Sequence, residues 1–219
     1  KLAHEIKNPL TPIQLTVDSL KIKYSDKLEI EQKEDFTKSL KIIGKQIKQI
    51  ENLVNEFSDF ARMPKPILKD NNLVTLIKDN INLIKELDSR VSLDFNFSRE
   101  DIILNSDNEQ LSRAFFNILK NSYESIQEKR VNNIDFTGKI EISLSDDASH
   151  VNLLIVDNGL GFETFKDNIK DILNPYFTTK KKGTGLGLAI VNKTINEHNG
   201  SIDFISIENG AKIYIKFIK

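Results

Sequence analysis

Two long segments near the start of the chain repeat apolar residues in steps of three and four, with polar side chains between them. The repeating positions are Ala3, Ile6, Leu10, Ile13, Val17, Leu20 and Tyr24, and then Phe36, Leu40, Ile43, Ile47, Ile50, Val54, Phe57 and Ala61. Such spacing indicates a helix with an apolar stripe. The polar stretch "SDKLEIEQKED" separates the segments, which predicts a hairpin of two helices. Stripes this long favour two hairpins packing as a dimeric four-helix bundle over helices that pack only on their own chain.

A pair of prolines marks the end of the second segment. The sequence there reads "ARMPKP", and Pro64 and Pro66 cannot continue a helix and favour extended conformations in the residues before them. The pattern of apolar positions changes at the same point. We therefore predict a hairpin domain over 1–63, a linker over 64–67 and a second domain over 68–219.

In the second domain, strand patterns alternate with helical patterns. Helical spacing covers 73–87, 108–130 and 185–200, and alternation typical of strands covers 91–97, 101–107, 139–145, 150–157, 201–208 and 211–218. We expect Gly200 to close the last helix and Asn209-Gly210 to form the last hairpin turn. Pairs of strands between single helices favour an α/β sandwich, with a mixed sheet and its helices on one face, over a doubly wound parallel sheet. The whole chain is then an α+β protein.

Composition narrows the possible partners and chemistry. Of 219 residues, 31 are Lys or Arg and 32 are Asp or Glu, so no overall basic field favours nucleic acid or an anionic membrane surface. There is no cysteine, which excludes disulfides, thiolate nucleophiles and cysteine metal sites. No apolar run approaches the roughly 20 residues of a membrane span. We expect a fragment of a longer chain that makes no direct membrane contact.

Glycines concentrate in one region of the second domain. Five of the nine lie between Gly159 and Gly187, in "DNGLG" and "KKGTGLGLAI". The sequence "GTGLGLAIV" is a glycine loop that leads into a helix, and free N–H groups at a helix start favour an anion such as phosphate. It matches neither the P-loop nor the strand-preceded dinucleotide motif. Taken alone, the loop also fits a helix start that simply packs closely on its neighbours.

Three further groups of residues accompany this loop. Asn117 and Asn121 are one helical turn apart, so their amides share a face and could reach a ligand or a hard cation together. Asp157 ends a strand, where its carboxylate could accept a hydrogen bond from an amino group. The segment "NPYFTTKKKGTG" adds three lysines that could cover a polyphosphate. Each group alone also fits surface amides, an Asx turn or a solvated loop.

Five motifs together resemble those of the sensor histidine kinases of two-component systems. They are "AHEIKNPLTP" for the H box, "NILKNSYES" for the N box, "DNGLG" and "GTGLGLAIV" for the two G boxes, and "PYFTTK" for the F box, all in the family's order. The stretches "HEIKNPLTPIQL" and "PYFTTKKKGTGLGLAIV" are most similar to the nitrogen-regulation type. The resemblance implies a dimerisation and phosphotransfer hairpin followed by a Bergerat-type ATP-binding domain.

The resemblance also implies roles in the H box. His4 would attack the γ-phosphate of ATP, since a neutral imidazole is a usable nucleophile near physiological pH. Glu5 would polarise the imidazole by accepting a hydrogen bond from one ring nitrogen, so that the other keeps its lone pair. Asn8 shares the His4 face and could orient a water, which implies an additional phosphatase function. Glu5 and Asn8 also fit an ordinary solvated helix surface.

In the second domain the resemblance implies an ATP site that uses Mg²⁺. Asn121 would bind the metal, Asn117 would lie near the phosphates, and Asp157 would read adenine. The remaining nucleotide-binding positions that it implies are Gly159, Gly161, Lys180, Thr184, Gly185, Leu186 and Gly187. Mg²⁺ would neutralise charge on the phosphate oxygens during transfer.

The resemblance also implies partners and a cellular location, and two alternatives to a histidine kinase stay open. It implies a homodimer, a response-regulator receiver domain whose aspartate takes the phosphoryl group, a cytoplasmic position for this portion, and a parent protein anchored in the inner membrane. A gyrase-like ATPase would require a glutamate where this chain has Asn117, and it would not explain the hairpin with His4. A non-catalytic dimeric nucleotide-binding scaffold would not need the intact motifs.

Overall fold

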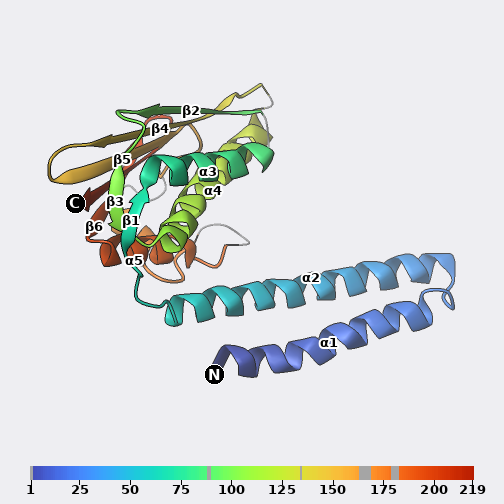
Figure 1. Ribbon diagram of the computed structural model, residues 1–219. Helices are drawn as coiled ribbons and strands as arrows, with labels where there is room; N and C mark the ends of the chain where they lie inside the picture. The colour runs from blue at the N-terminus through green and yellow to red at the C-terminus, as the bar shows by residue number, and fades with distance from the viewer. Residues whose placement is uncertain (1, 88–89, 134, 163–168, 179–182) are drawn as a thin grey trace. The chain divides into compact units, whose positions relative to one another are not determined.

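A computed structural model (Figure 1) describes residues 2–87, 90–133, 135–162, 169–178 and 183–219. Contacts divide the chain into a helical unit, Lys1–Met63, to which the described residues 183 and 184 also belong, and a larger unit made of Pro64–Thr178 and Gly185–Lys219. No helix in the described ranges combines the length and apolar character that crossing a membrane requires.

The first unit is a hairpin of α1 (Leu2–Tyr24) and α2 (Ile30–Ala61). Helix α1 continues through Pro9 and Pro12. Each proline removes one N–H donor from the helical ladder, so the carbonyls of Glu5 and Asn8 lose their helical partners. The prolines therefore cause a local loss of hydrogen bonds within one continuous helix.

The hairpin buries only half of the apolar stripe. The buried half consists of Leu10, Val17, Leu40, Ile47 and Val54, which are alternate positions in the middle of the stripe and are each at most 8% exposed, whereas Tyr24 and Ala61 in the same register are exposed. Of the alternate positions, Ile6 (36% exposed), Ile13 (46%), Ile43 (43%) and Ile50 (43%) are exposed and form the outer half of the stripe, whereas Leu20 and Phe36 pack partly against the buried cluster. One hairpin therefore satisfies one line of apolar contacts and leaves a second, parallel line in contact with solvent.

The second unit is built on a mixed sheet of five strands in the order β2-β4-β5-β7-β6. Strands β2 and β4 are parallel, and every other neighbouring pair is antiparallel. The strands are β2 (Val91–Phe97), β4 (Gly138–Asp146), β5 (His150–Asp157), β6 (Gly200–Ile207) and β7 (Gly210–Ile218), and the helices are α3 (Leu73–Leu87), α4 (Asn108–Asn132), α5 (Gly187–Glu197) and the short 3₁₀ helix η2 (Ile169–Leu173). Helices α3, α4 and α5 lie on one face of the sheet (Figure 1). The expected α/β sandwich is confirmed.

The core of this unit lies between the sheet and its helices. Alternate residues of β4 and β5 are buried, as period-two patterning requires. They include Ile140, Ile142 and Ile155, each at most 2% exposed, which join Phe115 and Ile118 of α4 in one cluster. Burial of this face of α4 fixes the rotation of the helix about its axis, and so fixes where its polar side chains point.

One predicted strand has an unexpected partner. The segment 101–107 contains β3 (Ile103–Ser106), which pairs antiparallel with β1 (Lys69–Asn72) in a separate two-stranded sheet, and not with 91–97. The strand β1 has the sequence KDNN, whose polar side chains gave no hydrophobic signal. Its pairing depends on backbone hydrogen bonds and on the adjacent Leu73, which is fully buried.

Two turn predictions were wrong in detail. The residue with the left-handed conformation after α5 is Asn199 (φ 55°), whereas Gly200 already belongs to β6, close against Ile195 and Phe217. In the last hairpin Ile207 pairs with Gly210, so Glu208 and Asn209 form the turn and Gly210 (φ 147°) begins β7. Both glycines serve close packing, which sequence patterns do not reveal.

The residues after the helical unit are held at the start of α4. Ile67 N–H donates to Oδ2 of Asp107 (2.9 Å), and Nε2 of Gln110 donates to the carbonyl of Pro64 (3.1 Å). Asp107 also caps α4, since its Oδ1 accepts from the N–H groups of Glu109 and Gln110. The predicted linker thus lies against the helix that carries Asn117 and Asn121.

Candidate functional site

The predicted H-box residues lie in the first two turns of α1. Residues 4, 5 and 8 are helical, and Glu5 and Asn8 are exposed. The side chain of His4 lies outside the described part of the structure. Helical spacing places positions 4 and 8 on one face, and burial of Leu10 and Val17 orients a different face of α1 toward α2. The geometry of the backbone therefore leaves the Asn8 face open.

The two N-box asparagines lie on α4 beside its buried face. Asn117 and Asn121 are half-buried, and the intervening Ile118 and Leu119 are fully buried. Helix α4 packs against both α3 and α5. The asparagines therefore lie one turn apart at the margin of the core, where amide oxygens can meet a ligand while the helix stays rigid.

Asp157 is a buried carboxylate at the end of β5. Its side chain is 3% exposed, and its Oδ1 accepts a hydrogen bond from Gly159 N–H (3.0 Å). Burial raises the pKa of Asp157, while the Ser122 hydroxyl, the Gly159 and Ala211 N–H groups and the Lys129 charge oppose that rise. Ser122 approaches the carboxylate without a hydrogen bond of good geometry. Such a buried acceptor suits an amino group presented by a ligand.

Two of the predicted glycines have positive φ and tight surroundings. Gly161 (φ 71°) packs on the Gly210 carbonyl, and Gly185 (φ 72°) packs on the backbone of Tyr176 and Phe177. A hydrogen bond from Tyr176 N–H to the Gly185 carbonyl (3.1 Å) ties the F box to the second G box. Any Cβ at these positions would overlap backbone atoms, so both glycines are required by local geometry.

The start of α5 differs from these packed positions. Among the described residues, apart from its own helix and chain neighbours, no atom lies within 4 Å of where a Cβ on Gly187, the first residue of α5, would stand, and Leu186 before it is fully buried. Thr184 is half-buried. The buried leucine anchors the helix start, and the open space beside Gly187 gives a ligand access to the first N–H groups of the helix. Lys180 lies outside the described residues.

Sequence patterns missed the residues that hold the first G-box loop. Asn158 accepts a hydrogen bond from Lys139 N–H (2.7 Å) and donates one to the Thr137 carbonyl (3.0 Å). On the other side, Ser125 and Lys129 of α4 bond to the loop backbone. Positions 122, 125 and 129 follow one another at steps of three and four and so share one face of α4. This spacing was the available sign that one face of the helix contacts the loop.

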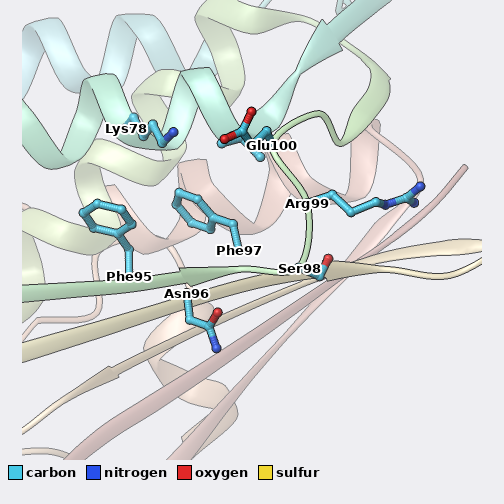
Figure 2. Close-up of a pocket in the computed structure, with 8 residues that line it drawn as sticks. Lys78, Phe95, Asn96, Phe97, Ser98, Arg99 and Glu100 are labelled. Atoms are coloured by element: carbon cyan, nitrogen blue, oxygen red, sulfur yellow. The ribbon is translucent and has the colours of Figure 1, made fainter.

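A pocket beside the edge strand of the sheet does not include any of these residues. It lies between α3 and the edge strand β2 and is lined by Val74, Lys78 and residues 95–100 (Figure 2). Phe95 and Phe97 stack with ring centroids 5.3 Å apart, and the ammonium of Lys78 lies 5.9 Å from the Phe97 ring. The predicted site is thus defined by its motifs and not by this hollow.

Two family models match the chain. Residues 106–219 match "Histidine kinase-, DNA gyrase B-, and HSP90-like ATPase", and residues 1–66 match "His Kinase A (phospho-acceptor) domain". The order of the two agrees with the hairpin and sandwich described above. The chain belongs to the histidine kinases. This confirms the family and the fold class expected from the five motifs.

Relatives of this histidine kinase core include kinases of the nitrogen-regulation type. It is 37% identical over 218 residues to the NtrY-like sensor histidine kinase of Rickettsia felis, covering 99% of this chain and 35% of the relative. It is 36% identical over 216 residues to the nitrogen regulation protein NtrY of Azorhizobium caulinodans, covering 99% of this chain and 27% of the relative. The core thus spans about a third or less of these curated relatives.

Solved structures show the same architecture. The catalytic domain of histidine kinase ThkA is 29% identical, with a TM-score of 0.60, 69% of this chain covered and 95% of that chain. ThkA in complex with the response regulator protein TrrA is 25% identical, with a TM-score of 0.68, all of this chain covered and 60% of that chain. The likeness extends over both units of the histidine kinase core.

Proposed function

We propose that this histidine kinase core binds ATP in its second unit, transfers the γ-phosphoryl group to His4, and passes that group to an aspartate of a response-regulator receiver domain. The main support is the buried Asp157, which directly precedes the first G-box loop and lies near Ser122 of α4, the helix that carries the two asparagines. The carboxylate would accept from the amino group of adenine, and the open start of α5 at Gly187 would face phosphate.

The amide oxygens of Asn117 and Asn121 on α4 suit Mg²⁺ bound together with phosphate and water better than a metal ion bound by protein side chains alone. Among the described residues, no three His, Cys, Asp or Glu side chains cluster as a metal site. Mg²⁺ commonly binds through one or two protein oxygens together with phosphate and water. Asn121 would supply such an oxygen, with Asn117 near the phosphates. When bound, the ion neutralises charge on the phosphate oxygens.

Phosphoryl transfer to His4 would use the groups around it on α1. One ring nitrogen attacks the γ-phosphorus, the bond to the bridging oxygen breaks, and ADP leaves. Glu5 would accept a hydrogen bond from the other ring nitrogen and stabilise the positive charge that develops there. Asn8, one turn away on the same face, would orient a water in a phosphatase function.

The hairpin would act as a homodimer. The outer half of the stripe repeats every seven residues in both helices, at Ile6 and Ile13 and at Ile43 and Ile50. A second hairpin related by a two-fold axis would cover the same line on both copies and complete a four-helix bundle. The 1–63, 64–67 and 68–219 boundaries would then separate the dimer, the linker and the nucleotide domain.

A different face of α1 would receive the response regulator. Leu15 (64% exposed) and Ile22 (83% exposed) follow Asn8 at steps of seven, so they continue the face of the phosphoacceptor motif. Exposed apolar side chains in line with a reactive group are typical of a docking surface. The solved complex of ThkA with TrrA shows that a protein of this fold binds a response regulator.

One experiment tests the reaction and separates the alternatives. The protein is incubated with Mg²⁺ and ATP labelled at the γ-phosphate. We expect label on the protein that is labile to acid and stable to alkali, and a His4→Gln variant should carry none. Label retained in that variant would place the phosphorylated residue elsewhere. ATP turnover without label would support the gyrase-like ATPase, and nucleotide binding without either would support the scaffold.

The cellular setting stays a prediction. A cytoplasmic position for this portion and an inner-membrane anchor in the parent protein follow from the resemblance alone.

A further inference from the structure

The side chain of Lys129 is fully engaged with the first G-box loop. Its Nζ donates to the carbonyls of Asn158 (2.8 Å) and Gly159 (3.0 Å), and it lies 4.7 Å from the centroid of the Phe136 ring. An ammonium has three N–H donors, so two carbonyls and one aromatic face account for all of them. Lys129 is half-buried, which strengthens each of these interactions relative to a solvated lysine.

Ser125 holds the same loop one turn earlier on α4. Its Oγ accepts a hydrogen bond from Leu160 N–H (2.9 Å). A Cβ on Gly159 would overlap Ser125, so the loop backbone lies directly against the helix. Lys129 and Ser125 therefore bond to three consecutive residues, from Asn158 to Leu160, immediately after the buried Asp157.

These contacts join the loop to the helix that carries the two asparagines. Asn158 ties the loop to β4, and Ser125 and Lys129 bond it to α4. Lys129 lies eight residues after Asn121, about 12 Å along one rigid helix. The loop next to the proposed adenine position and the asparagines next to the proposed phosphate position are therefore attached to the same helix.

We propose that Lys129, assisted by Ser125, is a positioning residue for base recognition: it sets the Asn158–Leu160 loop on α4 so that Asp157 meets the adenine amino group while Asn117 and Asn121 meet the phosphates. The proposal rests on the proposed ATP-binding function. Lys129 does not itself touch the nucleotide. Its loss should therefore weaken discrimination between bases more than it weakens binding of a triphosphate in general.

The test compares ATP and GTP affinity by calorimetry for the whole chain. Lys129→Met removes the ammonium and keeps the stem. We expect ATP binding to weaken about tenfold, the equivalent of the hydrogen bonds lost, while the weaker GTP binding hardly changes. Lys129→Arg should restore most of the ATP preference. Lys139→Met is the matched control, because within the described residues its ammonium pairs with the side chains of Asp94 and Glu141 and not with the Asn158–Leu160 loop.

A pH series adds a readout that a purely structural role would not move. The Lys129 charge lowers the pKa of Asp157, so Lys129→Met should raise it further. Because the ionised carboxylate is the acceptor, ATP binding of the variant should be lost at a higher pH than in the wild type. Ser125→Ala keeps the ammonium, so its ATP preference should fall without that shift.

Several results would overturn the proposal. An unchanged ratio of ATP to GTP affinity in Lys129→Met would do so, as would an equal loss of both. If that variant does not fold, an unchanged ratio in Ser125→Ala decides against the proposal. If the wild type binds no ATP, the proposed function has failed, and amide exchange tests the role of Lys129 in holding the loop by itself. Faster exchange at Leu160 in Lys129→Met than in Lys139→Met would support that role, and equal rates would refute it.

Discussion

Replacing Ile43 by aspartate tests the proposed homodimer, and the neighbouring Ile42 offers a matched control. Ile43 belongs to the outer half of the stripe and is 43% exposed in the hairpin. Ile42 is 54% exposed, but its position falls outside the stripe. The same substitution at both positions changes charge, size and helix propensity equally, so only the placement relative to the stripe differs.

The expected effect follows from burial. Full burial of an isoleucine contributes roughly 1.5–3 kcal/mol, so covering the exposed fraction of Ile43 contributes about 0.6–1.3 kcal/mol in each protomer. A carboxylate at this position would be desolvated without a partner, which costs several kcal/mol per ion. Two copies together should exceed about 5 kcal/mol. The dimer of Ile43→Asp should thus be weaker by about a thousandfold or more.

Sedimentation equilibrium over a range of protein concentrations measures this change. We expect a dimer for the wild type and for Ile42→Asp, and a monomer for Ile43→Asp at micromolar concentration. Circular dichroism should show that both variants keep their helices. A dimer of wild-type strength in Ile43→Asp would refute the bundle proposed here, and so would dissociation of Ile42→Asp to the same extent.

Two further predictions concern the second unit and α2. A Cβ at Gly210 would overlap the carbonyl of Asp157, so Gly210→Ala should lower the free energy of unfolding by more than about 3 kcal/mol. Gly44 has open space around it on α2, so Gly44→Ala should stabilise its helix by about 0.5–1 kcal/mol. Urea unfolding measures both changes, and equal effects of the two substitutions would contradict the difference in packing. A hydrogen bond from Arg99 and a weaker one from Lys219 hold the pKa of Asp146 at about 2, below its ordinary 3.8. Because the pKa is lower in the folded state, the ionised Asp146 stabilises the fold above pH 3.8, and this contribution is lost as the pH falls toward 2. Asp146→Asn should therefore be less stable than the wild type at neutral pH, with the difference vanishing near pH 2, and a pH-independent difference would exclude this linkage.

Local periodicity was sufficient to predict most of the elements. Helix α3 and strand β2 have the predicted bounds of 73–87 and 91–97, because their apolar spacing reflects a face that must be buried. Strand β1 was missed, because its polar residues pair through the backbone, and backbone hydrogen bonds leave no mark in the pattern of side chains. The turn at 208–209 was displaced by one residue, because Gly210 is required against Asp157 and not within the turn.

The motifs in the amino-acid sequence were enough to place this chain among the histidine kinases. They also predict Asn121 and Asp157 as site residues, since the chemistry of a site limits which residue types can stand there, and these two assignments stay predictions. The folded chain alone showed that one hairpin buries only half of the apolar stripe, a division that depends on how the two helices pack. It also brought Lys129 to the loop after Asp157. The sequence around Lys129 did not reveal which groups it binds, because those carbonyls lie about thirty residues further along the chain.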